Sequence, residues 1–147
     1  MTNLKIFDHT NKPSIEQKNE ILDFLFKHLE KYGDPRSDIE KCLNYSLKEN
    51  DKDGGFIITA KDNDKIIGAV IVNETGMEKY IPENILVYIA THADYRGKGI
   101  GKMLMQETIK ITKGDIALHV EPDNPARFLY EKYGFNSKYI EMRYKQK

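Results

Sequence analysis

The stretch Tyr95-Arg96-Gly97-Lys98-Gly99-Ile100-Gly101-Lys102 decides the fold predicted for this chain. It follows an apolar run, residues 85–90, that is typical of a buried strand. After it, apolar positions recur at the spacing of one helix face: Ile100, Met103, Leu104, Thr108 and Ile111. A strand that leads through a glycine-rich turn into a helix favours phosphate binding, because backbone N–H groups can approach an anion there. Arg96, Lys98 and Lys102 add positive charge, so we expect an anionic phosphate compound at this turn.

Two familiar phosphate-binding motifs do not fit the turn. A P-loop places four residues between its first glycine and a Gly-Lys-Ser/Thr sequence. Gly97 and Gly101 are separated by three residues, and Lys102 is followed by Met103. A dinucleotide fingerprint that begins at Gly97 would need a glycine where Lys102 stands. The turn therefore belongs to another class of phosphate-binding sequence.

The pattern that remains, Arg96-x-x-Gly99-x-Gly101, resembles the (Arg/Gln)-x-x-Gly-x-(Gly/Ala) signature of the GNAT N-acetyltransferases. In that family the amides of this loop hold the pyrophosphate of acetyl-CoA. The two residues before the turn, Ala93-Asp94, stand where many members have Pro-Glu, and Asp94 supplies a similar charge.

A second motif of the same family lies further along the chain. Residues 124–135 read Asn-Pro-Ala-Arg-Phe-Leu-Tyr-Glu-Lys-Tyr-Gly-Phe, which is similar to the family's closing motif, Asn, then Ala, then Leu-Tyr-Glu-Lys-x-Gly-Phe. The resemblance covers roughly residues 55 to 145, and the first fifty residues match only in kind, as a strand and two helices. Both motifs occur in order and at domain-like spacing, which implies a single N-acetyltransferase domain over residues 1–147.

Length and composition exclude several classes of protein. A chain of 147 residues suits one domain that needs neither a disulfide nor a metal to fold. Its 23 Lys and Arg balance its 23 Asp and Glu, which argues against nucleic-acid binding. Cys42 is the single cysteine, and the histidines lack metal-ligand spacing, so we expect a reducing compartment and no metal. No signal peptide or membrane-spanning run is visible, so a cytoplasmic location without membrane contact is expected.

The first fifty residues predict a short strand at Leu4–Phe7 and two helices. Ser14 with Gln17 is a capping box, followed by a helical stripe that stops at Gly33 and comprises Ile21, Leu22, Leu25, Leu29 and Tyr32. Ser37 with Glu40 predicts a second capping box. It opens a helix whose apolar face comprises Ile39, Cys42, Leu43, Ser46 and Leu47.

The rest of the chain predicts further strands. They are expected at residues 56–60, 66–72, 85–91, 115–120 and 138–144. The polar turn Lys61–Lys65 favours a hairpin, and residues 73–84 form a long loop of the kind that is often functional. The order β-α-α-β-β-β-α-β-α-β predicts an α/β fold with a mixed sheet of about six to seven strands and helices on both faces.

The resemblance also implies how acetyl-CoA, the co-substrate, would bind. Its phosphates would lie on the loop formed by Arg96, Gly97, Lys98, Gly99, Ile100, Gly101 and Lys102. In this family the end of the preceding strand, here Ile89, Ala90 and Thr91, splays from the next strand, and pantetheine lies between them and pairs with the backbone. Asn124 matches the family asparagine near the pantetheine, although an N-cap would use the same residue type.

Acetyl transfer to an amine requires proton transfers that side chains can assist. The CoA thiolate leaves faster if it is protonated. Tyr130 occupies the tyrosine position of Leu-Tyr-Glu-Lys, and its hydroxyl is protonated at neutral pH, so we expect it to be the general acid. Its spacing from Ala126, Leu129 and Tyr133 would equally suit a tyrosine packed in the core.

The attacking amine must lose its proton, which calls for a base. Glu83 precedes the strand at residues 85–91, where some GNAT enzymes carry a catalytic glutamate, and it is the first candidate. The rivals are Glu74, Glu78, His119 and Glu121. Many family members use ordered water instead, so a single base need not exist.

The acceptor amine stays open at this stage. The segments that usually shape its site, residues 15–50 and 73–84, carry several glutamates and tyrosines that suit a cationic amine, and Lys41, Lys48 and Lys79 offset that charge. A small-molecule amine or a protein amine would both fit, and a homodimer is compatible with the family. The alternative function is a non-catalytic acyl-CoA-binding sensor or interaction module, against which the presence of Tyr130 argues.

Overall fold

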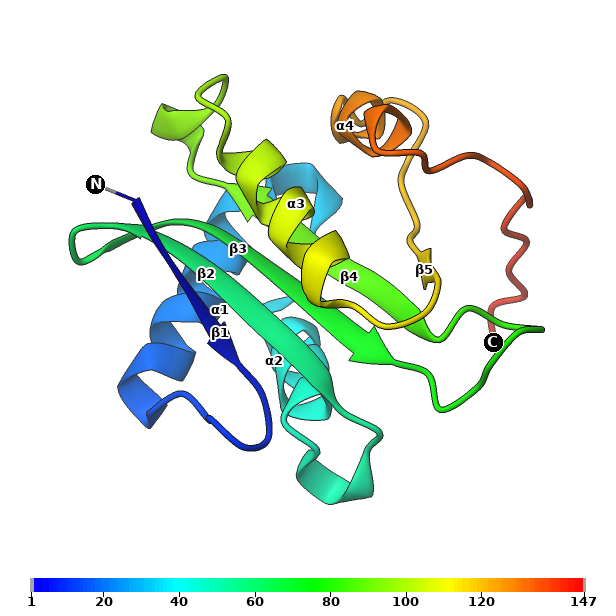
Figure 1. Ribbon diagram of the computed structural model, residues 1–147, viewed down its shortest axis with the longest axis horizontal. Coiled ribbons are helices and arrows are strands. Elements are labelled where there is room, and N and C mark those ends of the chain that lie inside the picture. Colours follow the sequence, from blue (N-terminus) through cyan, green and yellow to red (C-terminus); the bar gives the residue numbers. More distant parts are fainter. Residues whose placement is uncertain (1, 147) are drawn as a thin grey trace.

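The central sheet of the protein is mixed and has five strands in the order β1-β2-β3-β4-β5 (Figure 1). This computed structural model describes residues 2–146. The strands are β1 (Thr2–Phe7), β2 (Gly55–Asp62), β3 (Lys65–Glu74), β4 (Asn84–Thr91) and β5 (Ile116–Ala117). The first four pair antiparallel, and β5 pairs parallel with β4. The mixed sheet is confirmed, and it has five strands where six to seven were expected.

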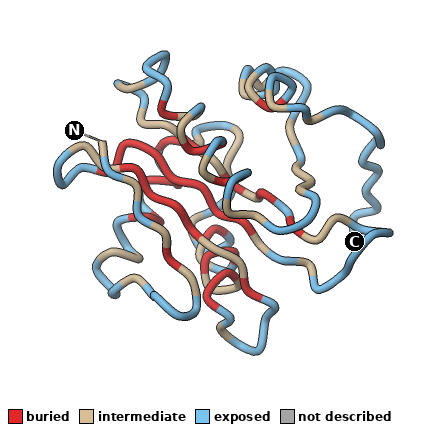
Figure 2. Tube along the Cα trace, viewed as in Figure 1, coloured by how far each residue is buried: buried red, intermediate tan, exposed pale blue. Residues whose placement is uncertain are grey.

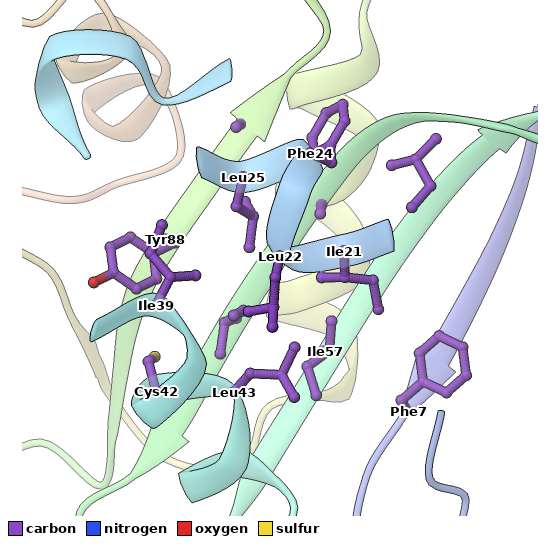
Figure 3. Packing of buried hydrophobic residues seen from close by; sticks show 14 of the residues in the cluster. Phe7, Ile21, Leu22, Phe24, Leu25, Ile39, Cys42, Leu43, Ile57 and Tyr88 are labelled. Atoms are coloured by element: carbon purple, nitrogen blue, oxygen red, sulfur yellow. The ribbon is translucent and has the colours of Figure 1, made fainter. Parts of the chain in front are cut away.

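Helices cover both faces of the sheet, as expected (Figure 1). They are α1 (Ile15–His28), α2 (Arg36–Ser46), α3 (Ile100–Ile111) and α4 (Ala126–Lys132), with short 3-10 turns at Glu30–Tyr32, Glu49–Asp51 and Ala93–Tyr95. Side chains of α1 and α2 pack with Ile57, Ile71 and Tyr88 of the sheet (Figure 3). On the opposite face Ile58 and Val70 pack with α3. Successive residues of a strand point to opposite faces, so the central strands are buried on both sides (Figure 2).

The two predicted helix starts differ in outcome. At Ser14 both halves of the capping box form, with Gln17 N–H donating to Ser14 Oγ at 3.1 Å and Ser14 N–H donating to Gln17 Oε1 at 2.8 Å. The box at Ser37 is wrong, because α2 already begins at Arg36 with Pro35 before it and no side-chain cap. Pro35 is the N-cap residue, so Ser37 already lies inside the first turn of α2 and cannot cap it.

The last predicted strands differ most from the structure. The strand expected at residues 115–120 is reduced to Ile116–Ala117, and the strand expected at residues 138–144 does not form. A strand exists only where its backbone finds a partner, so an alternating sequence is insufficient. The hairpin at Lys61–Lys65 is confirmed, since β2 and β3 pair as far as Asp62 and Lys65.

Helix α3 lies unusually close to the sheet. A Cβ added at Gly68 of β3 would meet Ile100 Cγ2 and Leu104 Cδ1, each at 2.8 Å. The missing side chain therefore sets how deeply the first turn of α3 settles on β3. No helix within residues 2–146 has the length and apolar character needed to cross a membrane.

Candidate functional site

Strand β4 opens away from its neighbour. It pairs with β5 only through Asn84 with Ile116 and Ile85 with Ala117, so within residues 2–146 its later part has β3 alone as a partner. The register with β3 shifts so that Val87 is an extra residue on β4, and such a bulge bends a strand. The free side of this part of β4, which includes Ile89, Ala90 and Thr91, can pair with an extended ligand. Below, this opening is called the splay.

The glycine turn lies directly after the splay. Gly97 and Gly99 have φ angles of 78° and 83°, which side chains rarely permit, and a Cβ on either would meet nothing within 4 Å. Gly99 is the N-cap of α3, so no side chain accepts from the first-turn amides, and this turn contains no acidic residue. The amides that open α3 therefore have no side-chain acceptor in the described part of the chain and can bind an anion.

The splay, the glycine turn and α4 meet at one residue. A Cβ added at Gly101 would lie 3.3 Å from Leu129 Cδ2 on α4 and 3.7 Å from Thr91 Oγ1 on β4. Leu129 is the neighbour of Tyr130 in the chain. Segments on which the two sequence motifs lie thus come together in space.

The three cations of the turn take different positions. Arg96 points away from the turn, since its Nη2 donates to the backbone oxygen of His28 at 3.1 Å and its Nη1 lies 3.3 Å from Glu30 Oε2. Lys98 Nζ lies 5.3 Å from the ring centre of Tyr95. Lys102 is exposed on α3. Lys98 and Lys102 have no ion-pair partner among the described residues, so their charges are available to an anion.

Tyr130 is buried on the α3 side of the sheet, and its ring centre lies 6.0 Å from that of Phe135. Burial raises its pKa to about 12, so the hydroxyl keeps its proton throughout the neutral range. The hydroxyl has no hydrogen-bond partner among the described residues. Every fully buried side-chain oxygen in that part of the chain has one, so the hydroxyl oxygen must still reach solvent. Tyr130 therefore offers a protonated, accessible donor on a buried ring.

Comparison with known proteins decides the family. The model of the family described as "Acetyltransferase (GNAT) family" matches residues 18–135. This chain belongs to the GNAT acetyltransferase family. The match extends further toward the N-terminus than the two motifs. It confirms the family that they implied.

Individual relatives of this GNAT domain agree with that assignment. The ribosomal protein bS18-alanine N-acetyltransferase of Haemophilus influenzae is 34% identical over 103 residues, 67% of this chain and 67% of that protein. N-alpha-acetyltransferase 30 of Schizosaccharomyces pombe is 34% identical over 85 residues, 54% of this chain and 57% of that protein, so the chain spans little more than half of it. The crystal structure of PH1933 from Pyrococcus horikoshii superimposes with a TM-score of 0.67 at 26% identity, covering 91% of this chain and 89% of that one.

In this GNAT domain Asn124 organises the start of α4. Its Oδ1 accepts from the backbone N–H of Ala126 at 2.9 Å, and its backbone oxygen accepts from Arg127 N–H at 3.1 Å. The side-chain amide group of Asn124 makes no hydrogen bond within the described part of the chain. The residue thus fixes the start of the helix that carries Tyr130, and its amide N–H groups have no partner in the described part of the chain.

Glu83 lies at the opposite end of β4 from the glycine turn and is held by backbone amides. Its Oε1 accepts from Asp115 N–H at 2.8 Å and its Oε2 accepts from Lys79 N–H at 3.1 Å. These amides hold the pKa of the carboxyl below its usual value. These contacts favour a structural role for Glu83, because they join the loop before β4 to the turn before β5. A carboxyl of lowered pKa is also a weak base.

The rival bases are all exposed: Glu74, Glu78, His119 and Glu121. No hydrogen bond, ion pair or ring contact within residues 2–146 joins any of them to Tyr130. Their assignment as bases stays a prediction.

The sequence did not predict the contacts that hold the splayed part of β4. Tyr88 Oη donates to Asp34 Oδ2 at 2.5 Å, which joins β4 to the connection between α1 and α2. The same connection reaches the segment before α4, where Lys31 Nζ lies 3.0 Å from Asp123 Oδ2 and Tyr32 Oη donates to the Asp123 backbone oxygen at 3.2 Å. These partners are far apart in sequence, and no local pattern relates them.

A pair of histidines in ring contact precedes the turn, and the sequence did not predict this contact either. The ring centres of His28 and His92 lie 4.2 Å apart. Nδ1 of His28 accepts from Ala93 N–H at 3.2 Å, and Nδ1 of His92 accepts from Asp94 N–H at 3.0 Å. Burial, and then the charge of His92, lowers the pKa of His28. The neutral form is the one that can accept, so the lowered pKa is consistent with this contact.

Proposed function

We propose that this domain transfers the acetyl group of acetyl-CoA directly to a primary amine. The observation that supports this most is the junction at Gly101, where the splay of β4, the open amides of α3 and the helix of Tyr130 converge. An anionic group on the α3 amides would have its chain directed along the splay toward that helix. Family membership supports the same reaction.

Each part of acetyl-CoA has residues suited to it. The amides of Gly97, Gly99 and the first turn of α3 would bind the phosphates, with Lys98 and Lys102 adding charge. The free backbone of Ile89–Thr91 would pair with the pantetheine amides. Arg96 would act mainly through its backbone, because its guanidinium is committed to His28 and Glu30.

The chemistry needs one new bond and one broken bond. The amine nitrogen attacks the thioester carbonyl, the carbon–sulfur bond breaks, and the amine proton passes to water or a base. Tyr130 would donate its hydroxyl proton toward the departing sulfur, where negative charge develops. Its accessible hydroxyl on a buried ring suits this position.

We propose a protein α-amine as the acceptor to test first. The relatives from H. influenzae and S. pombe are named for N-acetylation of alanine and for N-alpha-acetylation. With a pKa of about 7.7–8.0, roughly a quarter of α-amines are neutral at pH 7.4, against roughly one in 10³ for lysine. An α-amine therefore needs little help from a base, which agrees with the lowered pKa of Glu83.

Two matched peptides separate these acceptors. One has a free N-terminus and no lysine, and the other is N-terminally acetylated and contains one lysine; release of CoA is measured for each. We expect turnover with the first peptide alone. If CoA is released only with the lysine peptide, or only with polyamines, the proposal of an α-amine acceptor is refuted. Binding of acetyl-CoA without any turnover would favour the non-catalytic alternative.

A further inference from the structure

Two imidazole rings lie where the glycine turn is joined to helix α1, and the proposed reaction uses neither of them. His28 is in the last turn of α1 and is buried, and His92 follows β4 with a largely buried side chain. Their ring centres lie 4.2 Å apart. The ring of Phe24, a core side chain of α1 (Figure 3), lies 4.7 Å from that of His28 and 6.4 Å from that of His92. Two titratable groups are therefore packed against the core beside the turn.

His28 holds both ends of the short segment that leads into the glycine turn. At one end its Nδ1 accepts from Ala93 N–H at 3.2 Å. At the other end its backbone oxygen accepts from Arg96 Nη2 at 3.1 Å. Arg96 immediately precedes Gly97, the first glycine of the turn. The contacts of His28 therefore help to set where the backbone of the turn lies.

His92 holds the same segment from its first residue. Its Nδ1 accepts from Asp94 N–H at 3.0 Å, so that it caps the 3-10 turn Ala93–Tyr95, and its backbone N–H donates to the Ile67 oxygen on β3 at 2.8 Å. An imidazole nitrogen accepts a hydrogen bond only when it carries no proton. Both contacts at Nδ1 therefore require neutral rings.

Protonation would reverse these contacts. An imidazolium carries N–H at both nitrogens, so Nδ1 of each ring would face an amide N–H as a second donor. Two cationic rings with centres 4.2 Å apart would also repel each other. The Asp94 carboxylate, whose Oδ2 lies 4.0 Å from His92 Nδ1, would attract the charged ring in place of the amide. The segment would thus lose the two bonds that Nδ1 atoms now accept.

Charges around the pair set the pH range of this change. The charged and titratable groups that face it from α1, from the two adjoining 3-10 turns and from the glycine turn are Lys27, Glu30, Asp94, Tyr95 and Arg96. Burial, followed by the charges of His92, Lys27 and Arg96, lowers the pKa of His28, and Glu30 opposes this shift. Because the folded-state value is lowered, the contribution of His28 is complete above about pH 6.5 and is lost as the pH falls through the folded value.

We propose that His28 and His92 position the glycine turn in their neutral forms, and that their protonation releases the turn and weakens the binding of CoA. Both are positioning residues, since they act on the ligand through the backbone of the turn. The inference rests on the proposed function, because it takes the turn to be the site of the CoA phosphates.

The affinity for CoA, measured by titration calorimetry at two pH values, tests this role. The double variant His28→Asn, His92→Asn keeps an oxygen acceptor near the position of each Nδ1 but does not titrate. His9→Asn is the matched control, because His9 is exposed in the loop before α1. Between about pH 8 and about pH 5 we expect Kd to rise roughly tenfold more in wild type and in His9→Asn than in the double variant. The titration of CoA itself is common to all three proteins and cancels.

The outcomes of this experiment separate the two proposals. A purely structural role of the pair would change Kd by the same factor at both pH values. If wild type, control and double variant share one pH dependence, the inference is overturned while the CoA site stands. If wild type does not bind CoA at about pH 8, the proposed site fails, and the inference fails with it.

A titration of the wild-type chain covers the case in which the double variant does not fold. By linkage, a ligand that requires neutral rings must lower the pH at which they protonate, by up to about one pH unit for a tenfold coupling. NMR signals of the imidazole protons, followed against pH with and without CoA, measure this directly. We expect CoA to move the titration of the pair downward. An unchanged or upward-shifted titration of both rings would refute the role of the pair.

Discussion

The hydroxyl of Tyr88 donates a 2.5 Å hydrogen bond to Oδ2 of Asp34, which ties the open part of β4 to the connection between α1 and α2. Burial, and then this bond to the carboxylate, raises the pKa of Tyr88 well above its ordinary value. The hydroxyl therefore keeps its proton at neutral pH and remains a donor to Asp34. This contact holds one wall of the splay in place.

Replacing Tyr88 with Phe removes the bond while keeping the packing of the ring. We expect the free energy of unfolding to fall by about 1 kcal/mol, since a net hydrogen bond contributes that much. We also expect KM for the amine to rise more than KM for acetyl-CoA, because the bond anchors Asp34, which lies in the segment expected to shape the acceptor site. The matched control is Tyr45→Phe, which removes a 2.6 Å bond to the Glu74 backbone oxygen outside the splay. Equal effects of the two variants on KM would contradict this role.

Gly99→Val should remove binding of CoA. The residue has a φ of 83° and lies in open space, so a side chain strains the backbone and occupies the position expected for the phosphates. Gly134→Val is the control, because Gly134 has a φ of 93° and open space as well. Titration calorimetry should show at least a tenfold loss of affinity for CoA in the first variant. Both variants should lose comparable stability, and a Gly99→Val protein that binds CoA normally would exclude the turn as the phosphate site.

Tyr130→Phe should lower kcat by roughly 10²–10⁴ while the affinity for acetyl-CoA changes little. Tyr133→Phe, at the C-cap of the same helix, serves as the control and should stay close to wild type. Steady-state kinetics with the accepted amine, together with a binding titration, separates the two effects. Near-normal turnover of Tyr130→Phe would show that this hydroxyl is not the general acid.

Glu83→Gln distinguishes a structural carboxylate from a base. The folded-state pKa of Glu83 is lowered, so its contribution to stability is present above the unfolded value and is lost as pH falls through the folded one. Below about pH 4.5 we therefore expect wild type to lose stability more steeply than the variant, as followed by thermal unfolding. The shape of the pH–rate profile should be unchanged. Loss of its acidic limb in the variant would make Glu83 the base after all.

The sequence predicted best what is decided locally. The Ser14 capping box and the glycine turn before α3 each depend on residues within one or two helical turns of each other. The box at Ser37 was wrong because the helix begins at Arg36, one residue before the serine, with Pro35 as its N-cap. A capping-box sequence therefore predicts the first residue of a helix only where no other residue nearby can serve as the N-cap.

What the sequence could not predict depends on distant partners. Asp34 and Tyr88 are separated by 54 positions, and neither has a pattern that points to the other. Strand β5 is short because only Ile116 and Ala117 find partners on β4 among the described residues. Residues 138–144 alternate in polarity, yet no strand forms there. Periodicity reports which side chains could share a face, and pairing depends on whether another strand is within reach.

The most direct test of the central claim is a thermal-shift series with acetyl-CoA, CoA, ATP and NAD at equal concentrations. A ligand at about 100 times its Kd adds about 2.7 kcal/mol, which should raise Tm by several degrees in a domain of this size. If the splay and the glycine turn form an acetyl-CoA site, only the two CoA species will raise Tm. No shift with any of them, or equal shifts with ATP and NAD, would contradict the assignment of this site.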